Sequence, residues 1–224
     1  MRLINDHDAV LAILHDPAFV VPLVPAAIRG AGWLRATVGR FSTGAAYERR
    51  RALSVAVLDA IPPDTLRAAA PGHPVAILAR ATGVDEPVVD LVVDLVRGVA
   101  QAYQPGTGDD AHADAAVDQL VTIFGGHADE PTAARIGVLV QASDATVALI
   151  ERARHRPVAD VLRDDSPVPA TKRQALVART IGGIAVEAGE VVRLRLAGDL
   201  AFGAGPRRCP GRAHALALAA GGRA

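Results

Sequence analysis

The segment at residues 131–153 limits the fold more strongly than any other part of the sequence. A helix is predicted there, and apolar residues cover almost every side of it: Ile136, Val138, Leu139, Val140, Val147, Leu149 and Ile150. Because a helix that is apolar nearly all round must be buried, we expect it to run through the centre of the protein. Polar residues nevertheless stand in its middle, namely Gln141, Ser143, Asp144 and Thr146. Buried polar side chains need partners or a cavity, so this stretch is a candidate site.

The rest of the chain is predicted to be mainly helical with a small β component. Apolar periodicity and helix-ending residues predict further helices over 6–15, 44–60, 64–70, 74–82, 86–104, 114–124, 157–164 and 211–220. Residues 18–40 are rich in Pro and Gly and are predicted to be irregular. Apolar residues alternate with Arg193 and Arg195 after a turn at 188–190, which predicts a β hairpin over 183–197. We expect a single domain over 1–224, made of an N-terminal helical part (1–130), the central helix and a C-terminal part (157–224).

Composition and charge exclude several classes of protein. Half of the residues are apolar but only 3% are aromatic, so the core must be built from Ala, Val, Leu and Ile. Lys+Arg and Asp+Glu balance at 24 each, which argues against nucleic acid as the main partner. One cysteine allows no intramolecular disulfide. The N-terminus carries acidic residues inside its apolar run, and no stretch of about 18 uninterrupted apolar residues exists. We therefore expect neither a secretory signal nor a membrane span, and a cytoplasmic location.

The single cysteine lies in an unusual loop, residues 202–211, which reads FGAGPRRCPG. A lone cysteine is more often a small apolar core residue than a reactive one. Here three glycines allow tight turns, and Pro210 suits the first position of the last helix, so we expect Cys209 at a helix N-terminus. That position and the neighbouring Arg207 and Arg208 favour a thiolate over a thiol. A rigidly held thiolate is one of the axial ligands that proteins offer to haem iron.

The same loop resembles the haem-binding signature of the cytochrome P450 family. Phe202, Gly205, Arg207, Cys209 and Gly211 match its five fixed positions. The resemblance implies a reduced P450-like fold, haem b as cofactor and Cys209 as the axial ligand of the iron, with the other four residues contributing to cofactor binding.

Three further residues acquire a role only through this resemblance. Arg173 matches an arginine that reaches a haem propionate in the family. Residues 44–60 resemble the family's C helix, where Tyr47 and Arg51 replace a His and an Arg that contact a propionate. Their spacing of four residues places both on one helix face. Taken alone, each of these arginines is more simply read as a solvated surface residue.

The segment 131–153 resembles the long I helix of the family, which crosses the distal face of the haem. Its middle usually carries an acid followed by an alcohol, whereas here Asp144 is followed by Ala145 and then by Thr146. Asp144 and Thr146 are the candidate catalytic residues. Successive helical residues point about 100° apart, so Thr146 cannot simply replace the missing alcohol. Asp144 either relays protons or is a hydrated or paired acid.

Other departures from the family lie outside the central helix. The family is usually nearly twice as long. Its Glu-x-x-Arg pair appears as Asp160 and Arg163, with a carboxylate one methylene shorter. The helix that usually precedes this pair is missing, and only residues 197–199 bridge the predicted hairpin and the cysteine loop.

The resemblance implies a monooxygenase that inserts one oxygen atom from O2 into a small organic substrate. Its electrons would come from a ferredoxin-type donor that docks on Arg207, Arg208 and Arg212. The departures leave an alternative open, a non-catalytic haem-binding or relict protein that acts as a sensor or interaction partner. A Cys209-dependent hydrolase is a third and weaker hypothesis. Because the missing segments would leave apolar surface or one haem face uncovered, we also expect either a homodimer or weakly held haem.

Overall fold

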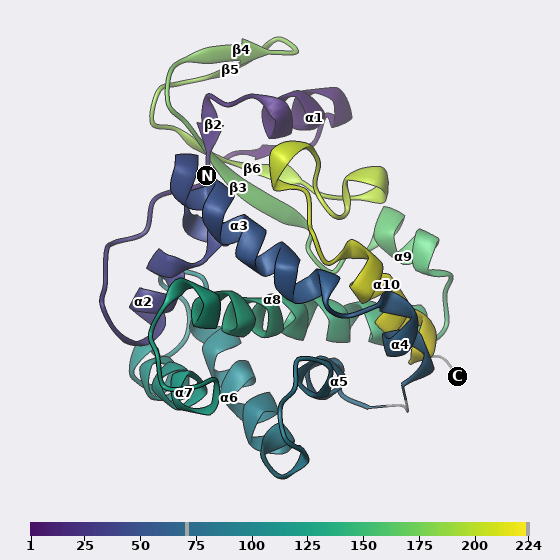
Figure 1. The fold of residues 1–224 in the computed structure, drawn as a ribbon. Helices are drawn as coiled ribbons and strands as arrows, with labels where there is room; N and C mark the ends of the chain where they lie inside the picture. The colour runs from purple at the N-terminus through teal and green to yellow at the C-terminus, as the bar shows by residue number, and fades with distance from the viewer. Residues whose placement is uncertain (70–71, 223–224) are drawn as a thin grey trace. The chain divides into compact units, whose positions relative to one another are not determined.

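The computed structural model describes residues 1–69 and 72–222 (Figure 1). The α-helices are α1 (His7–His15), α2 (Gly30–Thr37), α3 (Gly44–Asp59), α4 (Pro63–Ala68), α5 (Pro74–Ala81), α6 (Val89–Ala102), α7 (Asp110–Ile123), α8 (Glu130–Ala153), α9 (Val158–Asp164) and α10 (Arg212–Gly221). The strands are β1 (Leu3–Ile4), β2 (Phe19–Val20), β3 (Ala170–Ala175), β4 (Arg179–Ile181), β5 (Ile184–Val186) and β6 (Val191–Arg195). The 3-10 helices are η1 (Gly39–Phe41), η2 (Glu86–Val88), η3 (Gly198–Leu200) and η4 (Gly205–Arg207).

The chain divides into two compact units, each of which is discontinuous in sequence. The sheet unit comprises Met1–Pro22 and His155–Cys209. The helical unit comprises Leu23–Arg154 and Pro210–Ala224. Most of the large apolar core belongs to the helical unit, and the sheet unit has a smaller core of its own.

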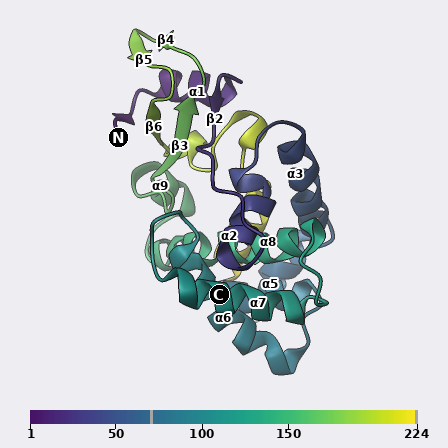
Figure 2. The same ribbon diagram turned by 90° about the vertical axis from the view of Figure 1, so that its left-hand side faces the viewer.

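Helix α8 is the central element of the helical unit, as its sequence predicts. It contacts α2, α3, α5, α6, α7 and α10, while α6 and α7 lie side by side in both views (Figures 1 and 2). Ile136 and Leu139 are fully buried. Asp129 caps the helix by accepting a hydrogen bond from the Thr132 amide, and Pro131 suits the first turn. Among the described helices, α8 alone is long and apolar enough to cross a membrane. However, 56% of its most apolar 18-residue stretch is buried inside the protein. Its apolar surface therefore serves the core.

The prediction that residues 18–40 are irregular is wrong, because α2 and β2 lie within this range. Helix α2 begins at Gly30, whose φ of +60° favours glycine. The amide of Ala31 donates to Asp114 Oδ1 at 2.7 Å, so the start of α2 is fixed by a side chain on α7. Helix α7 itself begins four residues earlier than predicted. Asp109 caps it by accepting hydrogen bonds from two backbone amides.

The sheet unit contains a four-stranded sheet in the order β1-β6-β3-β2. Strand β1 runs parallel to β6, and the other two pairs are antiparallel. Val192 and Leu194 on β6 are fully buried and belong to the same core as Val10 and Ile13 of α1. The alternation of apolar residues along β6 thus has its physical reason in α1, which packs on this side of the sheet.

The predicted hairpin over residues 183–197 is wrong in its pairing. Strand β5 pairs with β4 in a separate two-stranded sheet, and β6 pairs with β3. The turn at 188–190 does exist, since Gly189 has a φ of +80° and its amide donates to Ala175 O at 2.8 Å. This turn therefore joins β5 of one sheet to β6 of the other, and the two strands that it connects do not pair with each other. The true partner, β3, contains Lys172, Arg173 and Gln174, and so carries little apolar alternation.

Candidate functional site

The loop that carries Cys209 is compact and internally hydrogen-bonded. The amide of Cys209 donates to Phe202 O at 2.8 Å, and the amide of Arg208 donates to Gly205 O at 3.1 Å. The short helix η4 lies inside this loop, between Phe202 and Cys209. The side chain of Cys209 is exposed and is not part of a disulfide. The loop thus presents a thiol to its surroundings on a backbone that its own hydrogen bonds hold.

Gly205 is required by contact with α1. Its φ is +65°, and a Cβ at this position would lie 2.6 Å from the carbonyl oxygen of Leu14. Gly203 also has a positive φ, of +69°, but a Cβ at residue 203 would lie 4.0 Å from its nearest neighbour. Gly211 has a φ of −87° and would make only ordinary contacts with Leu58. Of the three glycines, Gly205 is therefore the one whose replacement by a larger residue the structure opposes most clearly.

The prediction that Cys209 lies at a helix N-terminus is wrong. Helix α10 begins at Arg212, with Gly211 as its N-cap, so Pro210 is not its first residue. The Cys209 amide is used within the loop by Phe202. The remaining electrostatic support for a thiolate comes from neighbouring cations. Arg207 is half-buried, while Arg208 and Arg212 are exposed.

Arg173 is buried, with a relative exposure of 5%. It lies on β3 opposite Val192, on the face of the sheet that also buries Leu194. Its Nη1 donates to Thr171 Oγ1 at 3.1 Å and to the carbonyl of Lys172 at 2.8 Å. The simple reading of Arg173 as a solvated surface residue is therefore wrong. A buried guanidinium is costly unless it is hydrogen-bonded or paired with an anion, and the hydrogen bonds to Thr171 and Lys172 offset that cost.

Tyr47 and Arg51 share one face of α3, as their spacing predicts. The guanidinium carbon of Arg51 lies 5.9 Å from the centre of the Tyr47 ring, within cation–π range. Both side chains are half-buried in the helical unit. The missing side chain of Gly39 lets η1 approach the backbone of α3 closely, because a Cβ at residue 39 would lie 3.3 Å from the Arg51 amide nitrogen.

An ion-pair cluster beside this pair was not predicted. Arg49 and Arg50 of α3 both bind the carboxylate of Glu130, with N–O distances of 2.7 to 2.8 Å. Arg50 also donates to Ser42 Oγ at 2.6 Å. The hydrogen bonds from Arg49 and then Arg50 lower the pKa of Glu130 to about 2. Eighty residues separate Arg50 from Glu130, so no local pattern announces this contact.

The polar residues of α8 divide between its buried and exposed sides. Ser143 and Thr146 are buried, with exposures of 4% and 3%, whereas Gln141 and Asp144 are exposed. Ser143 Oγ donates to Asp144 Oδ1 at 3.4 Å, and Gln141 Nε2 donates to the carbonyl of Gly137 at 3.1 Å. The expectation that this whole polar stretch is buried is therefore wrong for Gln141 and Asp144.

The pair that replaces the family's Glu-x-x-Arg does form. Arg163 Nη2 lies 2.6 Å from Asp160 Oδ1 within α9, and Arg163 Nε lies 3.0 Å from Asp164 Oδ1. The Arg163 side chain is 61% exposed, so the pair is a surface interaction of small energetic weight.

Comparisons with known proteins identify the fold. A scan against protein-family models finds no match, and a search of curated proteins finds none either. Solved structures do match. P450BioI in complex with hexadec-9Z-enoic acid ligated acyl carrier protein is 17% identical with a TM-score of 0.73, over 99% of this chain and 82% of the other. CYP109E1 from Bacillus megaterium in complex with testosterone is 17% identical with a TM-score of 0.68, over 97% and 82%. Ligand-free CYP164A2 from Mycobacterium smegmatis is 17% identical with a TM-score of 0.67, over 98% and 81%.

These likenesses establish the fold. The chain has a cytochrome P450-like fold, mainly α with small sheets, as the cysteine-loop signature predicts.

Proposed function

We propose that this protein is a haem-thiolate oxidoreductase in which the Cys209 thiolate is the axial ligand of the iron. The observation that carries the proposal is the exposed Cys209 side chain on a loop closed by the Cys209–Phe202 hydrogen bond of 2.8 Å, within a P450-like fold. A loop held by its own hydrogen bonds would keep the thiolate in one place, and a Cys thiolate is one of the axial ligands that hold haem iron.

The donor set suits haem better than a bare metal ion. Among the residues that the structure describes, no three His, Cys, Asp or Glu side chains form a group that would hold a metal ion. Haem brings its own four ring nitrogens and two propionates, so the protein needs to supply one axial ligand and some cations. Arg173, Arg207 and the Tyr47–Arg51 pair would contact propionates, through charge-assisted hydrogen bonds in the case of the arginines. Phe202, Gly205 and Gly211 would shape the loop around the ligand.

The proposed reaction is insertion of one oxygen atom from O2 into a small organic substrate, with haem b supplying the oxygen-activating chemistry when bound. Asp144 is exposed, so solvent reaches its carboxylate, which also accepts a hydrogen bond from Ser143. Thr146 lies two residues on, about 200° round the helix, and its hydroxyl is shielded from solvent. We therefore assign proton delivery to Asp144. Thr146 has a separate role, in which its solvent-shielded hydroxyl would contact a bound substrate.

The proposed electron donor is a ferredoxin-type protein. Arg208 and Arg212 are exposed and Arg207 is half-buried, and positive charge near the cysteine loop would attract an acidic carrier. The substrate class stays at small organic molecules. One neighbour binds an acyl-carrying protein and another binds testosterone, so the shared fold alone does not select a substrate.

The decisive test is the absorption spectrum of haem-loaded protein after reduction and addition of CO. The wild type is expected to give the strongly red-shifted Soret band of a thiolate–CO complex, and Cys209→Ser is expected to lose it. The matched control is Arg154→Gln, which removes an exposed side chain far along the sequence from the loop and should keep the band. Absence of the band in the wild type, or its survival in Cys209→Ser, overturns the proposal.

A non-catalytic haem-binding protein is the second candidate function. Ala145 favours it, because the position that usually holds an alcohol next to the acid lacks a hydroxyl. Turnover separates the two functions. A thiolate–CO band together with no reductant-driven product from a substrate panel supports the sensor or interaction role, whereas any oxygenated product supports the enzyme.

A further inference from the structure

Three cations lie together on the solvent face of the sheet in the sheet unit. Arg193 and Arg195 alternate with the buried Val192 and Leu194 along β6, so their side chains share the opposite face. Lys172 on β3 is the register partner of Arg193 and lies on that same face. All three residues are exposed. We call this group the sheet-face cluster.

The described residues provide no ion-pair partner for the sheet-face cluster. Within residues 1–69 and 72–222, no ion pair or side-chain hydrogen bond of Lys172, Arg193 or Arg195 is found. Other arginines of the same unit do have acidic partners, as in Arg2–Glu190 and Arg179–Asp16. Like charges directly opposite on neighbouring strands are destabilising, so Lys172 and Arg193 carry a cost in the absence of an external anion.

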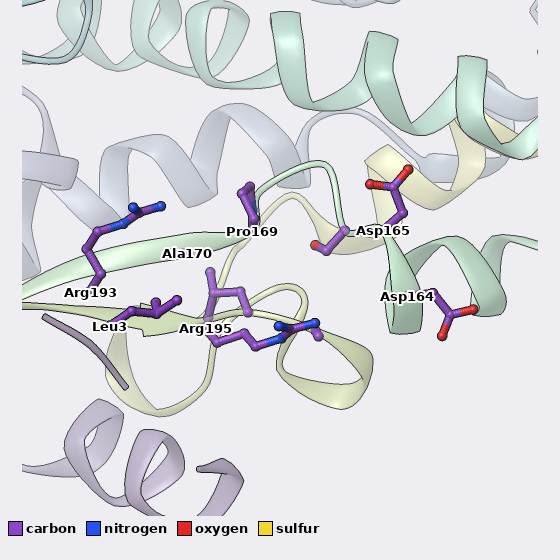
Figure 3. Close-up of a pocket in the computed structure, with 10 residues that line it drawn as sticks. Leu3, Asp164, Asp165, Pro169, Ala170, Arg193 and Arg195 are labelled. Carbon is purple, nitrogen blue, oxygen red and sulfur yellow. The ribbon is translucent and has the colours of Figure 1, made fainter. Parts of the chain in front are cut away.

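A small pocket adjoins two of these cations, Arg193 and Arg195. Its volume is about 170 Å³, and its lining includes Arg193, Arg195, Leu3, Ala170 and Ser166. Two acids also line it, but Figure 3 shows the carboxylates of Asp164 and Asp165 turned away from both arginines. Asp164 is engaged by Arg156 at 2.8 Å and by Arg163 at 3.0 Å. The arginine end of the pocket therefore keeps its positive charge.

We propose that the sheet-face cluster binds a small phosphoryl oxyanion, either inorganic phosphate or the phosphate of a phosphomonoester. Guanidinium groups match the geometry of phosphate oxygens with paired N–H donors, and an ammonium group adds a point charge. A dianion offsets the repulsion within the cluster better than a monoanion does. Pockets for drug-sized ligands are about 300–1,000 Å³, so this smaller pocket suits a compact group. The site is independent of haem, because none of its residues belongs to the cysteine loop or to the proposed propionate contacts.

The test is a titration of the full-length chain with inorganic phosphate in a chloride buffer near pH 7.5. Binding is measured by calorimetry and by the ³¹P linewidth of the phosphate. Wild type is expected to bind inorganic phosphate saturably. The double variant Arg193→Gln/Arg195→Gln is expected to bind at least about tenfold more weakly, because two charge-assisted contacts are lost. The matched control is Arg29→Gln/Arg154→Gln, which removes the same net charge from exposed positions outside the sheet unit and should bind like the wild type.

Glycerol 3-phosphate and vesicles containing phosphatidic acid distinguish the source of the phosphate. Competition by glycerol 3-phosphate with no vesicle binding supports a soluble ligand. Vesicle binding without saturable phosphate binding makes the cluster a lipid-binding face and overturns the proposal. Equal weakening in both double variants also overturns it, because net charge alone would then explain the binding. Circular dichroism of each variant checks that the fold is intact.

Discussion

The α-carbon of Gly205 faces the carbonyl oxygen of Leu14 so closely that a Cβ at residue 205 would lie 2.6 Å from that oxygen. Leu14 ends the buried face of α1, and Gly205 opens the short helix η4 that leads to Cys209. This contact ties the cysteine loop to the first helix of the sheet unit. The glycine of the P450-like signature therefore has a packing reason that is independent of any ligand.

Gly205→Ala is expected to destabilise the protein by about 2–4 kcal/mol, because the positive φ and the collision with Leu14 O both oppose a Cβ. Urea denaturation measures the loss. Gly203→Ala is the matched control. Gly203 has a similar φ, but a Cβ there would lie 4.0 Å from the nearest described atom. The substitution should therefore cost only about 1–2 kcal/mol. Equal losses in both variants would show that the Leu14 contact contributes nothing.

Tyr103→Phe is expected to leave stability unchanged or to raise it by up to about 1 kcal/mol. The Tyr103 hydroxyl is buried and has no hydrogen-bond partner among the described residues, and burial raises its pKa. The edge contact with Phe41, at a ring-centre distance of 5.3 Å, is kept by phenylalanine. Tyr103→Ala is the contrasting variant, since it removes the buried ring and should cost about 3–5 kcal/mol. A clear loss in Tyr103→Phe, measured by thermal unfolding, would mean that the hydroxyl has a partner.

Glu130→Gln is expected to cost about 1–2 kcal/mol at pH 7, because Arg49 and Arg50 lose a charged acceptor but Arg49 is largely solvated. The pKa of Glu130 is lowered from 4.5 to about 2 in the folded state. A lowered pKa gives stability that is fully present above pH 4.5 and is lost as the pH falls toward 2.

The difference between Glu130→Gln and wild type should therefore shrink between pH 4.5 and pH 2, as measured by urea denaturation at several pH values. Glu48→Gln is the control, because Glu48 is an exposed acid on the same helix α3. It should change stability by less than about 0.5 kcal/mol at every pH. A pH-independent difference for Glu130→Gln would contradict the ion-pair interpretation.

Asp199→Asn is expected to lower the pKa of His7. In the wild type the pKa is raised by the hydrogen bond with Asp8 and by that with Asp199, whose carboxylate lies 3.1 Å from His7 Nε2. The contribution of this contact to stability is fully present below pH 6.5 and disappears as the pH rises through the raised pKa of His7. NMR titration of the His7 ring reports the pKa directly. Asp6→Asn is the control, since Asp6 caps α1 through Ala9 and is not among the groups that raise the pKa of His7. An unchanged titration curve in Asp199→Asn would rule out the contact.

The sequence predicts best where local periodicity decides the structure. Helix α8 follows from its apolar residues, and the Tyr47–Arg51 contact follows from helical spacing. Prediction failed where distant residues decide. The start of α2 depends on Asp114, and the partner of β6 is β3, which lacks apolar alternation. The Glu130 cluster was missed for the same reason. At Cys209 the composition of the loop was informative, but the first turn of α10 lies further on than Pro210 suggests.

The parallel pairing of Leu3 with Arg193 has a consequence for how the chain folds. During synthesis, β1 leaves the ribosome long before its partner β6 exists, so the four-stranded sheet cannot close until residue 195 has been made. Residues 23–154 of the helical unit are continuous and can associate earlier, through contacts that are closer in sequence. Until the sheet closes, the faces of α1 and β1 that the sheet unit buries stay exposed, which leaves residues 3–15 open to chaperones and aggregation.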